Sequence, residues 1–264
     1  KSYSDALSDK KSYSDVLSDK KSYSDKTENN GSLDVVFDIQ SIHVNKQILC
    51  NSDSLVDVPV ASFSSAISPN WLDSYAIIVG INNILSKIPD YFEARLEKVV
   101  VAIPEIQYEI LNGNWQMIKI NPIFNNCKLL FFPINIDNRH WTLLMIDKSN
   151  NIGYHLDSLA NHSKNNKGQK SVKDNYQVAK NITEIILKDN ARYSNVDLDD
   201  QNNEYDCGAL TLYHLSVLID GYLNYGTNTN LIDYLKYKIS DEESLKYGIK
   251  DIRKRIYSVS SETN

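Results

Sequence analysis

Three short and strongly apolar segments in the middle of the chain constrain its fold most. They are CKLLFFPIN (127–135), HWTLLMID (140–147) and IGYHLDS (152–158), and short polar turns separate them. Each has the length and the β-branched or aromatic content typical of a strand. Segments joined by turns this short usually lie side by side in one sheet. We therefore expect adjacent strands of a central sheet here.

The segments around these strands alternate between strand and helix periodicity. VVVAIP (99–104) and ARYSNVDLDD (191–200) can each add a strand. Apolar residues at helical spacing predict helices in SPNWLDSYAIIVGINNILSKI (68–88), VKDNYQVAKNITEIILKDN (172–190), DCGALTLYHLSVLIDGYL (206–223) and the amphipathic DEESLKYGIKDIRKRIYSV (241–259). Helices that flank a mixed sheet make this an α+β or α/β domain.

The chain opens on a polar decad repeat, KSYSDALSDK, KSYSDVLSDK and a truncated KSYSDK. Each copy carries at most one apolar pair, which cannot bury a core. We expect residues 1–32, which include the linker TENNGS, to form a flexible tail, and a repeated docking motif is the alternative. The folded domain is then expected over 33–264, with a strand in SLDVVFDIQSIHV (32–44).

Composition and charge exclude several classes of function. A formal net charge of −6 argues against a nucleic-acid partner and suits a basic protein partner. Cys50, Cys127 and Cys207 are far apart and form no C-x-x-C pair, so neither a disulfide framework nor a cysteine zinc site is supported. We expect no metal and no cofactor. No apolar run approaches the ~18 residues of a membrane span, and KSYSDALSDK lacks a signal-peptide core.

Cys207 is the candidate nucleophile, in the segment QNNEYDCGAL (201–210). A cysteine nucleophile reacts as the thiolate, which a helix N-terminus or a nearby imidazolium stabilises. Cys207 opens a predicted helix, where backbone N–H groups favour an anion. Gly208 is expected to let backbone approach a ligand closely. On composition alone, however, a single cysteine is more often a buried and inert thiol.

His140 and Asp157 can complete a catalytic group around this cysteine. His140 stands where a polar turn meets a strand, and Asp157 ends the next strand, so a hairpin would bring them together as base and orienting carboxylate. His155 lies on the same face of its strand as Asp157 and is the rival base. Gln201 offers a side-chain amide that can stabilise a tetrahedral oxyanion.

The order of these residues resembles the Ulp/SENP family of clan CE cysteine proteases. The chain carries HW at 140–141, DS at 157–158 and Q-x-N-x-x-D-C-G at 201–208, as that family does. The segment WLDSY (71–75) is similar to the family's W-L-x-D-x helix, although Ser74 stands at the usual acidic position. The resemblance implies a papain-like, Ulp-type fold with a central mixed sheet flanked by helices.

The resemblance also implies roles, because that family cleaves after the C-terminal Gly-Gly of ubiquitin-like modifiers. Cys207 would attack the carbonyl, His140 would act as general base and then acid, and Asp157 would orient His140. Gln201 and the backbone N–H of Cys207 would form the oxyanion hole. Trp141 would cover a tunnel that only residues without a Cβ can pass. The expected substrate-binding residues are Trp141, Trp71, Asp73 and Gly208.

Structural roles are expected for several other residues. Trp71 and Trp115 also suit core or groove positions, and Cys50 and Cys127 read as small hydrophobes. Asp206 is expected to cap the helix that follows it. Surface or core positions are expected for His43, His162 and His214.

We expect a monomeric cysteine protease that removes ubiquitin or a ubiquitin-like modifier. A composition rich in Asn, Lys, Ile and Tyr indicates an AT-rich genome, as in some intracellular bacteria whose Ulp-like effectors are often deubiquitinases. We therefore expect a deubiquitinase secreted into the host cytoplasm as a bacterial effector, or otherwise an intracellular enzyme. A SUMO-type protease, an effector acetyltransferase that uses the same triad, and a pseudoenzyme are the alternatives. The net charge of −6 and the Asp-Ser pair favour the protease.

Overall fold

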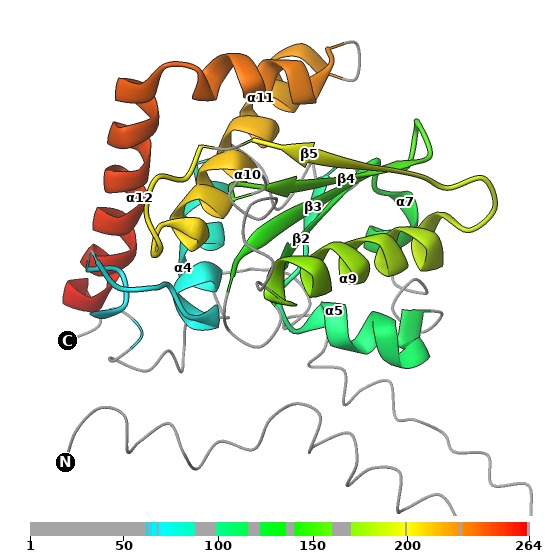
Figure 1. Cartoon of the computed structure of the whole chain (residues 1–264), viewed down its shortest axis with the longest axis horizontal. Helices are drawn as coiled ribbons and strands as arrows, with labels where there is room; N and C mark the ends of the chain where they lie inside the picture. The colour runs from blue at the N-terminus through cyan, green and yellow to red at the C-terminus, as the bar shows by residue number, and fades with distance from the viewer. Residues whose placement is uncertain are drawn as a thin grey trace, which may run out of the picture. The chain divides into compact units, whose positions relative to one another are not determined.

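The computed structural model in Figure 1 describes residues 62, 64–67, 69–87, 99–115, 122–135, 140–159, 170–198, 200–226 and 229–262. In chain order its elements are α4 (Ser74–Leu85), β1 (Val99–Val101), α5 (Ile106–Glu109), the π-helix η5 (Ile110–Asn114), α7 (Pro122–Asn126), β2 (Leu129–Ile134), β3 (Thr142–Asp147), β4 (Ile152–Asp157), α9 (Lys170–Leu187), β5 (Arg192–Asp197), α10 (Cys207–Tyr225), α11 (Leu231–Ile239) and α12 (Glu242–Glu262). The expected tail at 1–32 and the expected strand at 32–44 lie outside the described residues.

The strands form one mixed sheet in the order β1-β2-β3-β4-β5. The two edge strands pair in parallel with their neighbours, whereas β2, β3 and β4 are antiparallel. A short turn joins β3 to β4, and parallel pairing requires the longer connections that carry helices. The expected α+β architecture with a central mixed sheet is confirmed.

The strand β2 shows why the apolar segments are continuous. All of its residues are buried, because helices cover both faces of the sheet. Successive side chains point to opposite faces. Leu129 and Phe131 join the cluster formed with α4 and α10, whereas Leu130 and Phe132 join the cluster formed with α5 and α9. Figure 1 shows these helices on either side of the strands.

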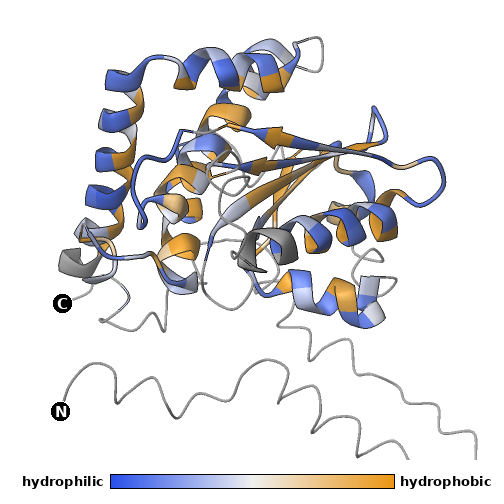
Figure 2. Ribbon diagram, viewed as in Figure 1, coloured by the Kyte–Doolittle hydropathy of each residue, from blue (hydrophilic) through white to orange (hydrophobic). Residues whose placement is uncertain are grey.

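The helices α10 and α12 differ in how much of their surface is apolar. The α10 segment is apolar nearly all round and most of it is buried, as expected of a helix in the middle of a core. The α12 segment is amphipathic, and Figure 2 shows its hydrophobic side turned toward the other helices. It packs against α4, α10 and α11.

Sequence periodicity predicted α4, α9, α10 and α12 but not the shorter helices. The α11 helix was missed although Asn230 is a capping residue whose side chain accepts hydrogen bonds from Ile232 N and Asp233 N. Within the described ranges, no helix has the length and apolar content needed to cross a bilayer.

Candidate active site

The sheet and α10 bring the ends of three elements together. His140 lies just before β3 and Asp157 is the last residue of β4. These strands are antiparallel neighbours, with Leu143 opposite Leu156, so both residues reach the same edge of the sheet. The α10 helix packs against β3 and begins at Cys207.

The His140 ring is held firmly by Asp157. Its Nε2 lies 2.7 Å from Asp157 Oδ1, and both side chains are 3% exposed. Asp157 Oδ1 also accepts a hydrogen bond of 2.9 Å from Leu159 N. The backbone around the histidine is fixed as well, because His140 N donates to Asn135 Oδ1 and His140 O accepts from Asn175 Nδ2. Nδ1 is then the ring nitrogen that can form a hydrogen bond with Cys207.

The electrostatics of the pair favour a protonated histidine. Burial alone would lower the pKa of His140, but hydrogen bonds with Asp157 and Cys207, and the negative charge of both partners, raise this pKa to about 9. Burial would raise the pKa of Asp157, and the hydrogen bond and charge of His140 hold it below its ordinary value. An imidazolium beside a cysteine at a helix N-terminus is the arrangement that stabilises a thiolate.

His155 does not compete for the role of base. Its ring is buried, with Nδ1 2.9 Å from Asn195 Oδ1 and Nε2 2.9 Å from Thr142 Oγ1. Burial lowers its pKa, so the ring is neutral at physiological pH. Because both nitrogens already have partners, His155 is a structural residue of the core.

Gln201 is buried and fixed at both ends of its amide. Its Oε1 accepts a hydrogen bond of 2.8 Å from Ser158 Oγ, and its Nε2 donates to Asn203 O at 2.6 Å. A carboxamide nitrogen carries two hydrogens, and this bond uses one of them. The serine of the Asp-Ser pair therefore positions the amide, which leaves the second hydrogen for another acceptor.

Trp141 and Gly208 are in direct contact. Trp141 Nε1 donates to Leu72 O at 2.7 Å, which fixes the indole ring. A Cβ on Gly208 would lie 3.0 Å from Leu72 Cβ and 3.1 Å from Trp141 Cδ1. Two side chains of the protein itself thus approach Gly208 closely, and the expected approach of a ligand to this glycine stays a prediction.

The segment before α4 gives different results for Trp71 and Asp73. Trp71 is 46% exposed, so it lies at the surface and not in the core. Asp73 caps α4, since its carboxylate accepts a hydrogen bond of 2.8 Å from Ala76 N. Trp115, in contrast, is buried edge-to-face against Phe124, as expected of a core aromatic.

Asp206 corrects another expectation from the sequence. It stands at the N-cap position of α10 but makes no side-chain capping hydrogen bond. Its carboxylate instead lies 2.7 Å from Arg253 Nη2 and accepts from Asn203 Nδ2. The sequence contained a signal for this arginine, because Arg253 lies on the same helical face as Ile249 and Ile256, and a buried cation needs an acidic partner.

The remaining histidine and cysteine in the described ranges have structural environments. His214 Nε2 lies 2.7 Å from Asp200 Oδ2, and both side chains are buried. Burial raises the pKa of the Cys127 thiol to about 11, and its Sγ donates to Phe124 O. Cys50, His43 and His162 lie outside the described residues. Among the residues that are described, no three His, Cys, Asp or Glu side chains gather as metal ligands would.

Similarity to known proteins agrees with this architecture. The profile of the Ulp1 protease family, C-terminal catalytic domain, matches residues 83–246. SUMO protease Ulp1 with its catalytic cysteine oxidised to a sulfinic acid is 16% identical with a TM-score of 0.50, over 84% of this chain and 93% of that one. A de-sumoylating protease is 15% identical with a TM-score of 0.52, over 77% and 86% of the two chains.

A third solved structure is that of an effector protein. The Xanthomonas campestris effector protein XopD, solved bound to ubiquitin, is 19% identical with a TM-score of 0.45, over 63% of this chain and 90% of that one. No curated protein sequence matches the chain.

Proposed function

The chain belongs to the Ulp1 protease family, and we propose that it is a cysteine peptidase that cleaves after the C-terminal Gly-Gly of a ubiquitin-like modifier. One observation carries the proposal. The His140 ring is buried, bonded to Asp157 at 2.7 Å and within hydrogen-bonding reach of Cys207, the first residue of α10. This geometry supports a nucleophile, a base and an orienting carboxylate in those positions.

In the proposed reaction, the Cys207 thiolate attacks the carbonyl carbon of the last glycine. The oxyanion that forms accepts hydrogen bonds from Gln201 Nε2 and from the backbone N–H of Cys207, which has no intrahelical partner at the start of α10. The His140 imidazolium gives its proton to the leaving amine as the C–N bond breaks. Water, deprotonated by His140, then hydrolyses the thioester and regenerates the thiolate.

The requirement for glycines is supported by the wall beside the nucleophile. Trp141 is nearly fully buried, packs against Gly208 next to Cys207 and is fixed by its bond to Leu72 O. A rigid aromatic wall at this point favours a substrate without side chains. Trp71, which directly precedes Leu72, is exposed and suits a contact with the folded part of the modifier.

Ubiquitin is the modifier that we propose, with SUMO as the alternative. The support is compositional, because richness in Asn, Lys, Ile and Tyr is typical of AT-rich genomes such as those of some intracellular bacteria. On the same basis we propose that the protein is a secreted effector that acts in the host cytoplasm, and we also propose that it is a monomer. A translocation reporter fused to the chain tests the location, and light scattering on the purified protein tests the monomer.

Activity-based probes test the enzymatic proposal directly. Propargyl-ended ubiquitin and SUMO are incubated with the wild type and with Cys207→Ala, His140→Ala and His155→Gln. We expect ubiquitin to label the wild type and His155→Gln, and neither Cys207→Ala nor His140→Ala. Labelling by SUMO alone would replace ubiquitin with SUMO as the substrate. No labelling by either probe would overturn the peptidase proposal, and acetyl transfer from acetyl-CoA in the presence of inositol phosphate would be assayed next.

A further inference from the structure

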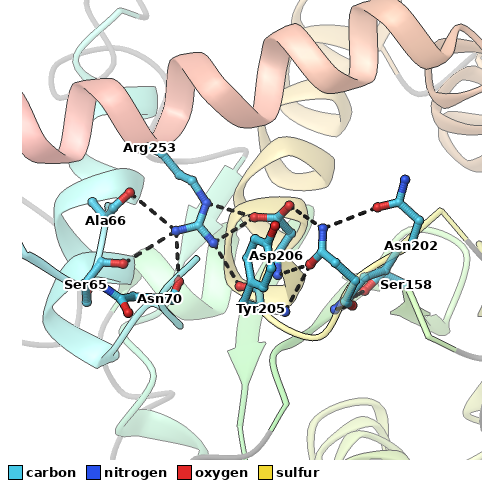
Figure 3. A network of polar contacts seen from close by, with 10 residues as sticks. Ser65, Ala66, Asn70, Ser158, Asn202, Tyr205, Asp206 and Arg253 are labelled. Carbon is cyan, nitrogen blue, oxygen red and sulfur yellow. Dashed lines mark hydrogen bonds and ion pairs between the residues drawn. The ribbon is translucent and has the colours of Figure 1, made fainter. Parts of the chain in front are cut away.

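Arg253 on α12 is a buried cation outside the catalytic group. Its side chain is 7% exposed, and Figure 3 shows it pointing from α12 into the space between two other segments. On one side, Nε and Nη2 both lie within 2.9 Å of Asp206 Oδ1, and Nη2 also donates to Tyr205 O at 2.8 Å. The guanidinium therefore binds both residues that directly precede Cys207.

Further hydrogen bonds connect Asp206 to Gln201, whose amide belongs to the proposed oxyanion hole. Asp206 Oδ2 accepts a hydrogen bond of 2.7 Å from Asn203 Nδ2, and Asn203 Oδ1 accepts from the backbone N–H of Tyr205 and of Asp206. The carbonyl of Asn203 in turn accepts from Gln201 Nε2. A continuous chain of hydrogen bonds thus runs from Arg253 through the loop to Gln201.

On its other side the same guanidinium binds the segment that leads into α4. Nη1 donates to Asn70 O at 3.0 Å, and longer contacts of 3.5 and 3.4 Å join it to Ser65 O and Ala66 O. Asn70 directly precedes the exposed Trp71. Figure 3 shows these carbonyls and the Asp206 carboxylate on opposite sides of Arg253.

We propose that Arg253 is a positioning residue, which holds the loop 201–206 and the start of α10 in register with the segment that carries Trp71. The part of the proposal that concerns turnover rests on the proposed peptidase function. Arginine suits this task because its planar fork can bind a carboxylate and several carbonyls at once, whereas a lysine offers one point of attachment. The family profile ends at residue 246, before this arginine.

The test compares Arg253→Lys and Arg253→Gln with the wild type and with a matched control. The control is Arg255→Ala, because Arg255 lies on the same helix, is half-exposed and forms an ion pair with Asp251 one turn earlier. Three quantities are measured at a temperature well below each melting point. They are the rate of Cys207 alkylation by iodoacetamide from pH 5 to 10, and kcat and KM on ubiquitin and SUMO with a fluorogenic C-terminal amide.

We expect both Arg253 variants to lose at least tenfold in kcat and in the alkylation rate of Cys207 at pH 7, with Arg255→Ala within twofold of the wild type. Arg253→Lys retains the charge and the apolar stem, so it reports on the fork itself. Variants that melt earlier but keep the wild-type kcat and the wild-type alkylation profile would show that Arg253 is merely structural, and the proposal would be overturned. Alkylation needs no modifier, so a wild type without peptidase activity would defeat the proposed function while the alkylation comparison still decides the role of Arg253.

Discussion

Replacing Asp157 by asparagine is expected to change the charge of His140. The amide keeps the shape of the carboxylate but removes the negative charge that acts on Nε2 at 2.7 Å. Asp157 contributes both a hydrogen bond and a charge to the raised pKa of His140, whereas burial works in the opposite direction. Without the carboxylate, only Cys207 still opposes the effect of burial, so the pKa of His140 falls.

The size of the effect follows from the wild-type pKa. A value of about 9, against an ordinary 6.5, means that the folded protein favours the protonated ring by about 3 kcal/mol, at ~1.4 kcal/mol for each pH unit. Cys207 supplies part of this preference, so the loss of Asp157 removes less than the whole of it. The reactivity of the cysteine at pH 7.5 should therefore fall by roughly ten- to hundredfold. His140 should then titrate at a lower pH than in the wild type.

The assay is the alkylation rate of Cys207 against pH, read from its peptide by mass spectrometry. The buried Cys127, whose pKa is raised to about 11, is an internal reference that should stay unreactive. The pKa of His140 is raised on folding, so its stabilising contribution is complete below pH 6.5 and lost as pH rises through about 9. Urea unfolding should therefore show this loss in the wild type and not in Asp157→Asn. Matching alkylation profiles in the two proteins would refute the reasoning.

Three further substitutions test the surroundings of the site. Gln201→Ala should lower kcat by roughly 10²- to 10³-fold with a small effect on KM, as measured with a fluorogenic substrate, because the proposed oxyanion hole loses one donor. Gly208→Ala should cost about 1–3 kcal/mol in urea unfolding, since its Cβ would lie 3.1 Å from Trp141 Cδ1 in a packed core. His214→Leu should lower the free energy of unfolding by about 3 kcal/mol, because the buried Asp200 loses its partner at 2.7 Å, and an unchanged urea midpoint would contradict that account.

The central sheet was predictable because its strands are buried on both faces. The sequence of a strand such as β2 is then a continuous apolar run. The short turn between β3 and β4 indicates that these two strands are antiparallel neighbours. The edge strand β5 is half exposed and has a weaker pattern, and the prediction there relied on length and turn residues. The same hairpin geometry made it possible to infer from the sequence that His140 and Asp157 would meet.

The role of Asp206 could not be predicted from local sequence. An acidic residue before a helix usually caps it, and that preference is all that a local pattern contains. Its actual partner is Arg253 on α12, which is 47 residues further along the chain. The guanidinium competes successfully for the carboxylate because it carries a full positive charge and presents two N–H groups to it, whereas a helix N-terminus carries only a partial charge.

The spacing in Q-x-N-x-x-D-C-G has a physical explanation in this loop. Asn203 closes the turn by accepting from two backbone N–H groups, and its own carbonyl and amide reach Gln201 and Asp206. Moving any of the three by one position would break these bonds. The motif therefore specifies a loop conformation as much as a set of reactive groups. A change at Asp206, which touches no substrate in the proposed reaction, should for this reason impair both the oxyanion amide and the nucleophile that directly follows it.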